Sequence, residues 1–144
     1  MPKTGTYVLV VDDHTDSREM LAEYLTFRGF EVIAAATGEA ALTQASTRRP
    51  GVILMDLEMP GTDGWDATRQ LKAHADTHDI IVVAITAHAL KPDEGIARQA
   101  GCDGFIAKPF DLRAVGTAIA AVMQHGRAGL VAIEALATPR RQPT

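Results

Sequence analysis

Five polar side chains follow short apolar runs along this chain, and their types suit one kind of chemistry: Asp12, Asp13, Asp56, Thr86 and Lys108. Three carboxylates brought close together repel one another unless a cation neutralises them. Ligands that are all oxygen favour a hard divalent ion, and magnesium fits best because it accepts one or two carboxylates and keeps further positions for a phosphoryl oxygen. Phosphoryl transfer needs a nucleophile, positive charge and hydrogen-bond donors around the phosphoryl oxygens. The set therefore predicts a magnesium-dependent phosphoryl site in which Asp56 is the nucleophile, assisted by Lys108 and Thr86.

The apolar runs before these residues are typical of buried strands. Strands are expected at residues 7–11, 30–35, 52–55, 80–85 and 105–107, where apolar side chains are nearly continuous. Helical spacing between them predicts helices at residues 16–28, 38–46, 63–71, 92–101 and 112–125. The first helix is expected to start at a capping pair of Asp16 and Glu19, and to carry on one face Met20, Leu21, Tyr24 and Leu25.

Strands that alternate with helices of this length predict an α/β fold with a doubly wound parallel sheet. Each parallel return needs a crossover of a dozen or more residues, and right-handed crossovers place helices on both faces. In such sheets ligands bind beyond the carboxyl ends of the strands. The five polar residues are expected at that edge. The length of 144 residues suits one core of ordinary size and is too short for two full domains.

Four segments in order along the chain resemble the response-regulator receiver family. They are residues 10–13 (VVDD), 55–64 (MDLEMPGTDG), 85–87 (ITA) and 107–110 (AKPF). The resemblance covers roughly residues 6 to 125, and it implies a flavodoxin-like sheet of five strands in the order 2-1-3-4-5. We expect one receiver domain over residues 1–125. Residues 126–144 are expected to form a C-terminal tail, either a short helix or a linker.

The resemblance also implies a role for each matching residue. Asp56 would accept a phosphoryl group from a phosphohistidine on a sensor histidine kinase or a histidine phosphotransfer protein. Asp13 and Asp56 would bind Mg²⁺, Asp12 would help through water, and the backbone carbonyl of Glu58 would supply a further ligand. Lys108 would pair with Asp56 and then with the phosphoryl group.

A second group of residues would respond to phosphorylation. By the same resemblance, Thr86 would move to hydrogen-bond a phosphoryl oxygen, and Phe105 would take an inward or outward position that follows Thr86. Ala87 is small and would leave the site open. The bond between Lys108 and Pro109, beside the site, would be cis, whereas X-Pro bonds in general are more often trans.

The five histidines are scattered over different elements without the spacing of metal ligands. Most are expected at the surface. His88 lies two residues after Thr86, and Glu58 lies two residues after Asp56, so both should border the phosphoryl site. Our hypothesis is that this pair sets the rate of dephosphorylation.

Composition excludes several classes of protein. The formal charge is −4, and no stripe of Lys or Arg interleaved with aromatics is present, so direct nucleic-acid binding is not expected. No apolar run approaches the roughly 18 residues of a spanning helix, and no signal-peptide pattern follows Met1, which favours a cytoplasmic protein without membrane contact. The lone Cys102 is expected to be a small buried apolar residue.

Two other functions compete with a signalling receiver. A phosphatase or phosphotransferase with an aspartyl-phosphate intermediate would use a second acid at the spacing of Glu58, but such enzymes need a cap segment that is missing here. A binding module that has lost phosphorylation would not need the complete acid, threonine and lysine set. We therefore expect a phosphoacceptor rather than an enzyme, which binds its downstream protein through the last two helices and the fifth strand. The identity of the partners, the oligomeric state and whether the chain is full length stay open.

Overall fold

The computed structural model describes residues 7–57, 64–86, 101–131 and 133. Its strands are β1 (Tyr7–Val11), β2 (Glu31–Ala35), β3 (Val52–Asp56), β4 (Ile81–Thr86) and β5 (Gly104–Ala107). They form one parallel five-stranded sheet in the order β2-β1-β3-β4-β5. This order confirms the predicted doubly wound, flavodoxin-like topology.

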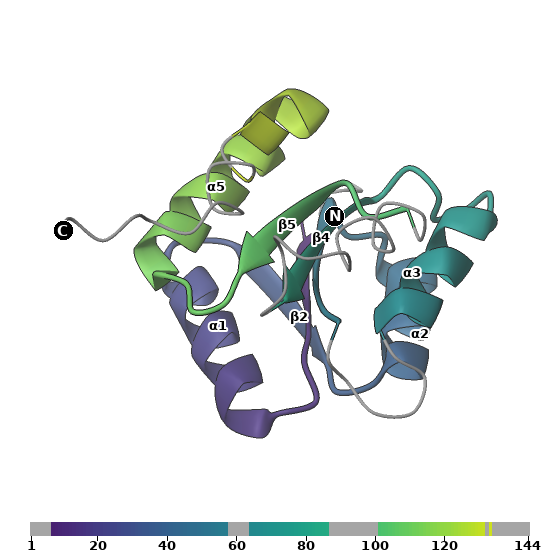
Figure 1. The fold of residues 1–144 in the computed structure, drawn as a ribbon, viewed down its shortest axis with the longest axis horizontal. Helices are drawn as coiled ribbons and strands as arrows, with labels where there is room; N and C mark the ends of the chain where they lie inside the picture. The colour runs from purple at the N-terminus through teal and green to yellow at the C-terminus, as the bar shows by residue number, and fades with distance from the viewer. Residues whose placement is uncertain (1–6, 58–63, 87–100, 132, 134–144) are drawn as a thin grey trace, which may run out of the picture.

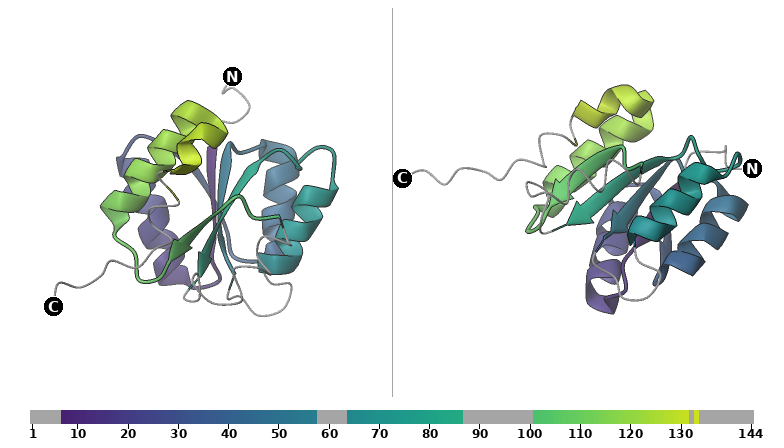
Figure 2. Two further views of the ribbon diagram at one scale, coloured as in Figure 1. Left: turned by 45° about the horizontal axis from the view of Figure 1, so that its top comes forward. Right: turned by 45° about the vertical axis from the view of Figure 1, so that its right-hand side comes forward.

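Helices pack on both faces of the sheet (Figure 1). They are α1 (Thr15–Phe27), α2 (Gly38–Arg48), α3 (Gly64–Ala73) and α5 (Leu112–His125), followed by the 3₁₀ helix η1 (Gly126–Gly129). Figure 2 shows α1 and α5 on one face and α2 and α3 on the other. The helix expected at residues 92–101 falls almost wholly outside the described residues. None of the helices in the described ranges is long and apolar enough to cross a membrane.

Side-chain alternation in the buried strands produces two cores. In β1, Val8 and Val10 face the core shared with α1 and α5, while Leu9 and Val11 face the core shared with α2 and α3. Successive residues of a strand point to opposite faces, so a strand that is apolar throughout must be covered on both sides. The continuous apolar runs of the sequence are therefore explained by this three-layer arrangement.

The start of α1 differs from the prediction. The helix begins at Thr15, with His14 in the N-cap position, and Asp16 lies in its first turn. The expected capping pair of Asp16 and Glu19 is therefore wrong. Met20 is 46% exposed, because the face of α1 that packs on the sheet is centred on Leu21 and Leu25.

The segment after α5 packs back onto the domain. Ile133 is fully buried, and Leu130 packs against the same core. Gly104 at the start of β5 accommodates them, because a Cβ there would lie 2.9 Å from Cγ2 of Ile133. Leu130 and Ile133 therefore lie against the start of β5 and in the core shared with α5. The predicted tail also includes residues 134–144, which lie outside the described residues.

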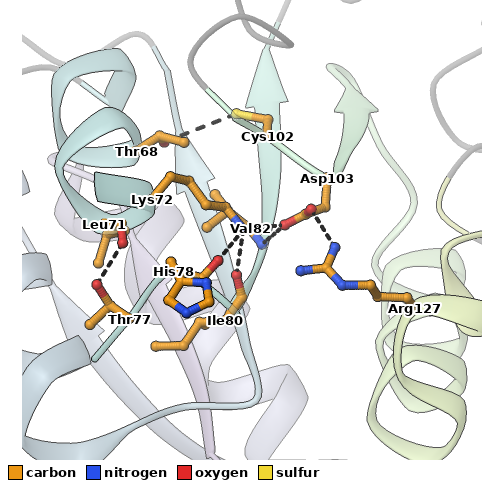
Figure 3. A network of polar contacts seen from close by, with 10 residues as sticks. All are labelled: Thr68, Leu71, Lys72, Thr77, His78, Ile80, Val82, Cys102, Asp103 and Arg127. Carbon is orange, nitrogen blue, oxygen red and sulfur yellow. Dashed lines mark hydrogen bonds and ion pairs between the residues drawn. The ribbon is translucent and has the colours of Figure 1, made fainter. Parts of the chain in front are cut away.

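A polar network centred on Asp103 joins the amino ends of β4 and β5 to α3 and η1 (Figure 3). Lys72 Nζ donates to Asp103 Oδ2 and to the Ile80 carbonyl, each at 2.8 Å. The Val82 amide donates to Asp103 Oδ2 at 2.8 Å, and Arg127 Nη1 donates to Asp103 Oδ1 at 2.6 Å. Burial raises the pKa of Asp103, but these donors outweigh it and hold the pKa below its ordinary value.

Cys102, next to this network, is buried as expected. Burial raises the pKa of its thiol to about 11. The thiol is therefore protonated near neutral pH and behaves as a small apolar group.

Candidate functional site

The carboxyl ends of four neighbouring strands bring the sequence-predicted residues to one edge of the sheet. Asp12 follows β1, Asp56 ends β3, Thr86 ends β4 and Lys108 follows β5. Backbone hydrogen bonds continue the strand pairing into this edge, because the Lys108 amide donates to the Thr86 carbonyl at 3.0 Å and the Leu57 amide donates to the Ile85 carbonyl at 3.1 Å. The register of the parallel strands therefore positions the site.

Three carboxylates and one imidazole meet at this edge. Each of Asp12, Asp13, His14 and Asp56 offers one donor atom, and these atoms all lie within 4.8 Å of one another. Asp12 and Asp56 are buried, and Asp13 is partly exposed. The three aspartates predicted to form a metal site are thus neighbours in the fold.

Lys108 supplies positive charge to this cluster. Its Nζ lies 3.3 Å from Oδ1 of Asp56, and the side chain of Asp56 is 2% exposed against 31% for Lys108. The ammonium group therefore offsets part of the negative charge of the buried Asp56 carboxylate.

The charges of the cluster perturb Asp12. Burial is the largest cause and raises its pKa, the backbone amide of His14 opposes this by donating to Asp12 Oδ1 at 2.9 Å, and the charge of Asp56 raises the pKa further. The net effect is a pKa above the ordinary value for aspartate. Burial and the neighbouring Asp56 charge therefore both disfavour the ionised form of Asp12.

These residues fit a hard divalent ion. Within the described part of the chain, Oδ1 of Asp13 is buried and accepts no hydrogen bond of good geometry, although His14 Nδ1 lies 3.1 Å away. Carboxylate oxygens are the donors that Mg²⁺ prefers. The carbonyl of Glu58, the fourth predicted ligand, lies outside the described residues.

The other predicted site residues divide into two groups. Thr86 is buried at the end of β4, and Phe105 is buried within β5, which is the inward position. The bond between Lys108 and Pro109 is cis. Ala87 and His88 lie outside the described residues, so their predicted place beside the phosphoryl site stays a prediction.

Gly64 allows α3 to start against the backbone that carries the site. A Cβ at this position would lie 2.4 Å from the carbonyl oxygen of Asp56 and 2.9 Å from Cα of Leu57. No side chain fits in that space without moving the backbone. Glycine at position 64 is therefore required for the observed position of Asp56.

Sequence reasoning missed His14, which it placed among surface histidines without metal-ligand spacing. The structure brings its Nδ1 to 3.1 Å from Asp13 and 3.5 Å from Asp12. The available signal was its position directly after the two aspartates, at the turn between β1 and α1, where a side chain can fold back toward its neighbours.

The comparisons with known proteins agree with this geometry. The family model of the response regulator receiver domain matches residues 8–120. The chain belongs to this family. It is 36% identical over 112 residues to the polar-differentiation response regulator DivK of Brucella anthropi, a match that covers 78% of this chain and 89% of DivK.

Solved structures of receivers are similar as well. The chemotaxis protein CheY4 of Vibrio cholerae is 26% identical with a TM-score of 0.76, over 81% of this chain and 97% of CheY4. The receiver domain of the sensor histidine kinase PA1611 from Pseudomonas aeruginosa is 30% identical with a TM-score of 0.74, over 86% of this chain and 98% of that domain. That structure holds a magnesium ion coordinated in its active-site cleft.

Membership of the family establishes the general function. Receiver domains are phosphoacceptors of two-component signalling that bind Mg²⁺ at an acidic pocket, and they interact with histidine kinases or phosphotransfer proteins and with downstream targets. The cluster of Asp12, Asp13 and Asp56 is consistent with such a pocket.

Proposed function

We propose that this receiver takes a phosphoryl group onto Asp56 from a phosphohistidine of a sensor kinase or a histidine phosphotransfer protein, with Mg²⁺ bound, and thereby changes which proteins it binds. One observation carries the proposal. The buried carboxylate of Asp56 lies within the acidic cluster and has the Lys108 ammonium 3.3 Å from its Oδ1. This combines a nucleophile with positive charge at one edge of the sheet.

The transfer is a displacement at phosphorus. A carboxylate oxygen of Asp56 forms a bond to phosphorus while the P–N bond of the phosphohistidine breaks, and the electron pair of that bond leaves with the imidazole. Lys108 balances the negative charge that the phosphoryl oxygens bring to the pocket. Asp12 and Asp13 would hold Mg²⁺ together with Asp56 and the Glu58 carbonyl, and the ion, when bound, neutralises part of the same charge.

Thr86 and Phe105 would convert phosphorylation into a change of shape. Thr86 ends the strand next to β3, one residue after Ile85, which pairs with Asp56. A shift of Thr86 toward a phosphoryl oxygen would leave space for the ring of Phe105, which is buried in the unphosphorylated protein. We propose that this ring moves with Thr86.

The lifetime of the phosphorylated state is a second part of the proposal. Ala87 would leave the phosphoryl group accessible, and His88 and Glu58 would border the path of the attacking water. Hydrolysis of its own acyl phosphate would reset the protein without turnover of a small substrate. The protein is then a signalling phosphoacceptor that assists its own reactions.

The proposed downstream surface consists of α5, β5 and the segment 92–101. Phe105 is a buried residue of β5, so a movement of its ring would alter a strand that forms part of this surface. Leu130 and Ile133 lie beside the start of β5 and in the core shared with α5, so a partner that uses this surface would also approach the segment that carries them.

Intact-mass analysis after incubation with acetyl phosphate tests the phosphoacceptor. Wild type should gain the mass of one phosphoryl group with Mg²⁺ and should gain none when the ion is removed. Asp56→Asn should gain none in either condition. Asp66→Asn is the matched control, because Asp66 lies on the exposed side of α3, and it should behave as wild type. A full gain of mass in Asp56→Asn would contradict the proposal.

Fluorine NMR tests the switch. Fluorinated phenylalanine would be incorporated, and the resonance of Phe105 assigned by loss in Phe105→Leu. Phosphorylation should shift this resonance in wild type. In the Thr86→Ala variant, phosphorylation should leave the resonance unshifted. An equal shift in both proteins would contradict the coupling of Phe105 to Thr86.

A further inference from the structure

His14 occupies the N-cap position of α1 but does not cap the helix. An N-cap side chain usually accepts a hydrogen bond from the first turn, and Ser, Thr, Asp and Asn are favoured there. The side chain of His14 makes no such bond. Helix capping therefore does not explain the orientation of the His14 side chain.

The imidazole of His14 instead contacts the acidic pocket. Its Nδ1 lies 3.1 Å from Oδ1 of Asp13 and 3.5 Å from Oδ1 of Asp12. The amide of His14 donates to the same oxygen of Asp12 at 2.9 Å, which holds the turn in the shape that folds the ring back. The backbone and the side chain of His14 are thus both directed to the carboxylates.

These distances match those between neighbouring ligands of one metal ion. Two ligands that each lie about 2.1 Å from an ion, at a right angle to one another, are roughly 3.0 Å apart. The distances from Nδ1 to the two carboxylate oxygens are close to this value, and the four donors of the cluster lie within 4.8 Å of one another. The imidazole can join the pocket after a small adjustment.

A nitrogen donor changes which ions a pocket prefers. Mg²⁺ takes oxygen ligands, whereas imidazole suits divalent transition-metal ions, and affinity for the latter increases from Mn²⁺ to Ni²⁺. The side chain of His14 is 71% exposed, so an ion that enters the pocket from solvent can reach its Nδ1 without a rearrangement of the core.

We infer that His14 is a metal ligand of this pocket, and that the receiver binds imidazole-preferring divalent transition-metal ions there in addition to Mg²⁺. The inference rests on the proposed function, because it concerns the same pocket. It extends that function by giving the site a mixed oxygen and nitrogen ligand set.

Isothermal titration calorimetry with Ni²⁺ and Mg²⁺ separately tests this ligand set. We expect His14→Ala to lower the ratio of Ni²⁺ affinity to Mg²⁺ affinity by about tenfold or more. His125→Ala is the control, because His125 lies in the last turn of α5. The ratio of Ni²⁺ affinity to Mg²⁺ affinity in this variant should equal that of wild type. Asp13→Asn should weaken the binding of both ions, which shows that Ni²⁺ enters this pocket and not a surface histidine.

Visible absorption of bound Co²⁺ gives a second readout. Replacing a nitrogen ligand with water changes the ligand field, so the bands of wild type and His125→Ala should coincide and those of His14→Ala should shift. An unchanged Ni²⁺ to Mg²⁺ ratio together with unchanged Co²⁺ bands in His14→Ala would overturn the inference.

The two proposals fail in distinguishable ways. If wild type is phosphorylated on Asp56 with Mg²⁺ and His14→Ala leaves the Ni²⁺ to Mg²⁺ ratio unchanged, His14 is not a ligand and the proposed function stands. If no divalent ion binds wild type and Asp56 is not labelled, the proposed function is wrong and the inference falls with it.

Discussion

At the carboxyl ends of the strands, Asp12, Asp13 and Asp56 lie close together, and the ammonium group of Lys108 contacts Asp56. At the amino ends, the single carboxylate of Asp103 is shared by two cations. The pKa of Asp12 is raised above its ordinary value, mainly by burial and further by the charge of Asp56. The pKa of Asp103 is lowered, because the donors around it outweigh its burial. The same residue type is therefore held in opposite electrostatic conditions at the two ends.

This difference separates a structural cluster from a functional one. Asp103 accepts hydrogen bonds from a backbone amide and two side chains, so its charge is satisfied within the described part of the chain. The carboxylates at the other end leave negative charge that suits a cation from solution. A buried excess of one charge costs stability and persists where a ligand uses it.

Replacing Asp103 with alanine should produce the largest loss of stability. It leaves the mostly buried ammonium of Lys72 without its carboxylate and the Val82 amide without its acceptor. We expect the free energy of unfolding to fall by about 3 kcal/mol, measured by urea denaturation. Asp66→Ala, which breaks an exposed pair with Arg69, should cost about 0.5 kcal/mol or less. Equal losses in the two variants would contradict the structural role of Asp103.

Replacing Asp12 with asparagine should raise the free energy of unfolding instead of lowering it. Asparagine can still accept a hydrogen bond from the His14 amide, and the substitution removes a negative charge close to that of Asp56. In buffer free of divalent ions we expect a gain of about 1 kcal/mol in urea denaturation. Added Mg²⁺ should stabilise wild type more than the variant and so reduce the gain. A loss of stability without divalent ions would show that the carboxylates do not repel one another.

The pH dependence of stability should also differ between the two ends. Asp103 has a folded pKa below the ordinary 3.8, so its contribution is complete above pH 3.8 and is lost as pH falls through the folded pKa. Asp12 has a folded pKa above 3.8, so it destabilises the ionised protein and this penalty disappears as pH falls toward 3.8.

Urea denaturation at several pH values, without divalent ions, compares each asparagine variant with wild type. The deficit of Asp103→Asn should be constant above pH 3.8 and shrink below it, and the advantage of Asp12→Asn should shrink as pH falls toward 3.8. If both variants were less stable than wild type above pH 3.8, or both more stable, the contrast between the two aspartates would be wrong.

Removing Arg127 should have the smallest effect. Its side chain is 54% exposed. Without Arg127, Asp103 still accepts hydrogen bonds from Lys72 and from the Val82 amide. Arg127→Ala should lower the free energy of unfolding by about 0.5 kcal/mol. Lys72→Ala, tested beside it, should cost several times more. A loss in Arg127→Ala as large as in Lys72→Ala would mean that the network depends on the C-terminal segment.

The strands and the residues at their ends could be predicted from the sequence, because a parallel sheet makes both easy to recognise. A strand covered on both faces is a continuous apolar run, and Asp56, Thr86 and Lys108 stand at the ends of such runs. Strand ends that are distant in sequence meet at one edge, so the chemistry of the cluster followed from its residue types.

Local turns and long-range contacts were not predictable in the same way. Whether Asp16 or His14 occupies the N-cap position of α1 depends on a shift of two residues that hydrophobic spacing does not resolve. The contact of His14 with the pocket depends on its side-chain rotamer. Asp103 lies 31 positions after Lys72 and 24 positions before Arg127 in the sequence. No local sequence pattern indicates such pairs.

The central claim is that the carboxylate of Asp56 receives the phosphoryl group. An acyl phosphate is reduced by borohydride to an alcohol, which converts a phosphorylated aspartate into homoserine. After phosphorylation with acetyl phosphate and Mg²⁺, reduction and peptide sequencing by mass spectrometry should find homoserine at position 56 and aspartate at positions 12, 13 and 103. Homoserine at position 12 or 13, with unmodified aspartate at position 56, would contradict the account.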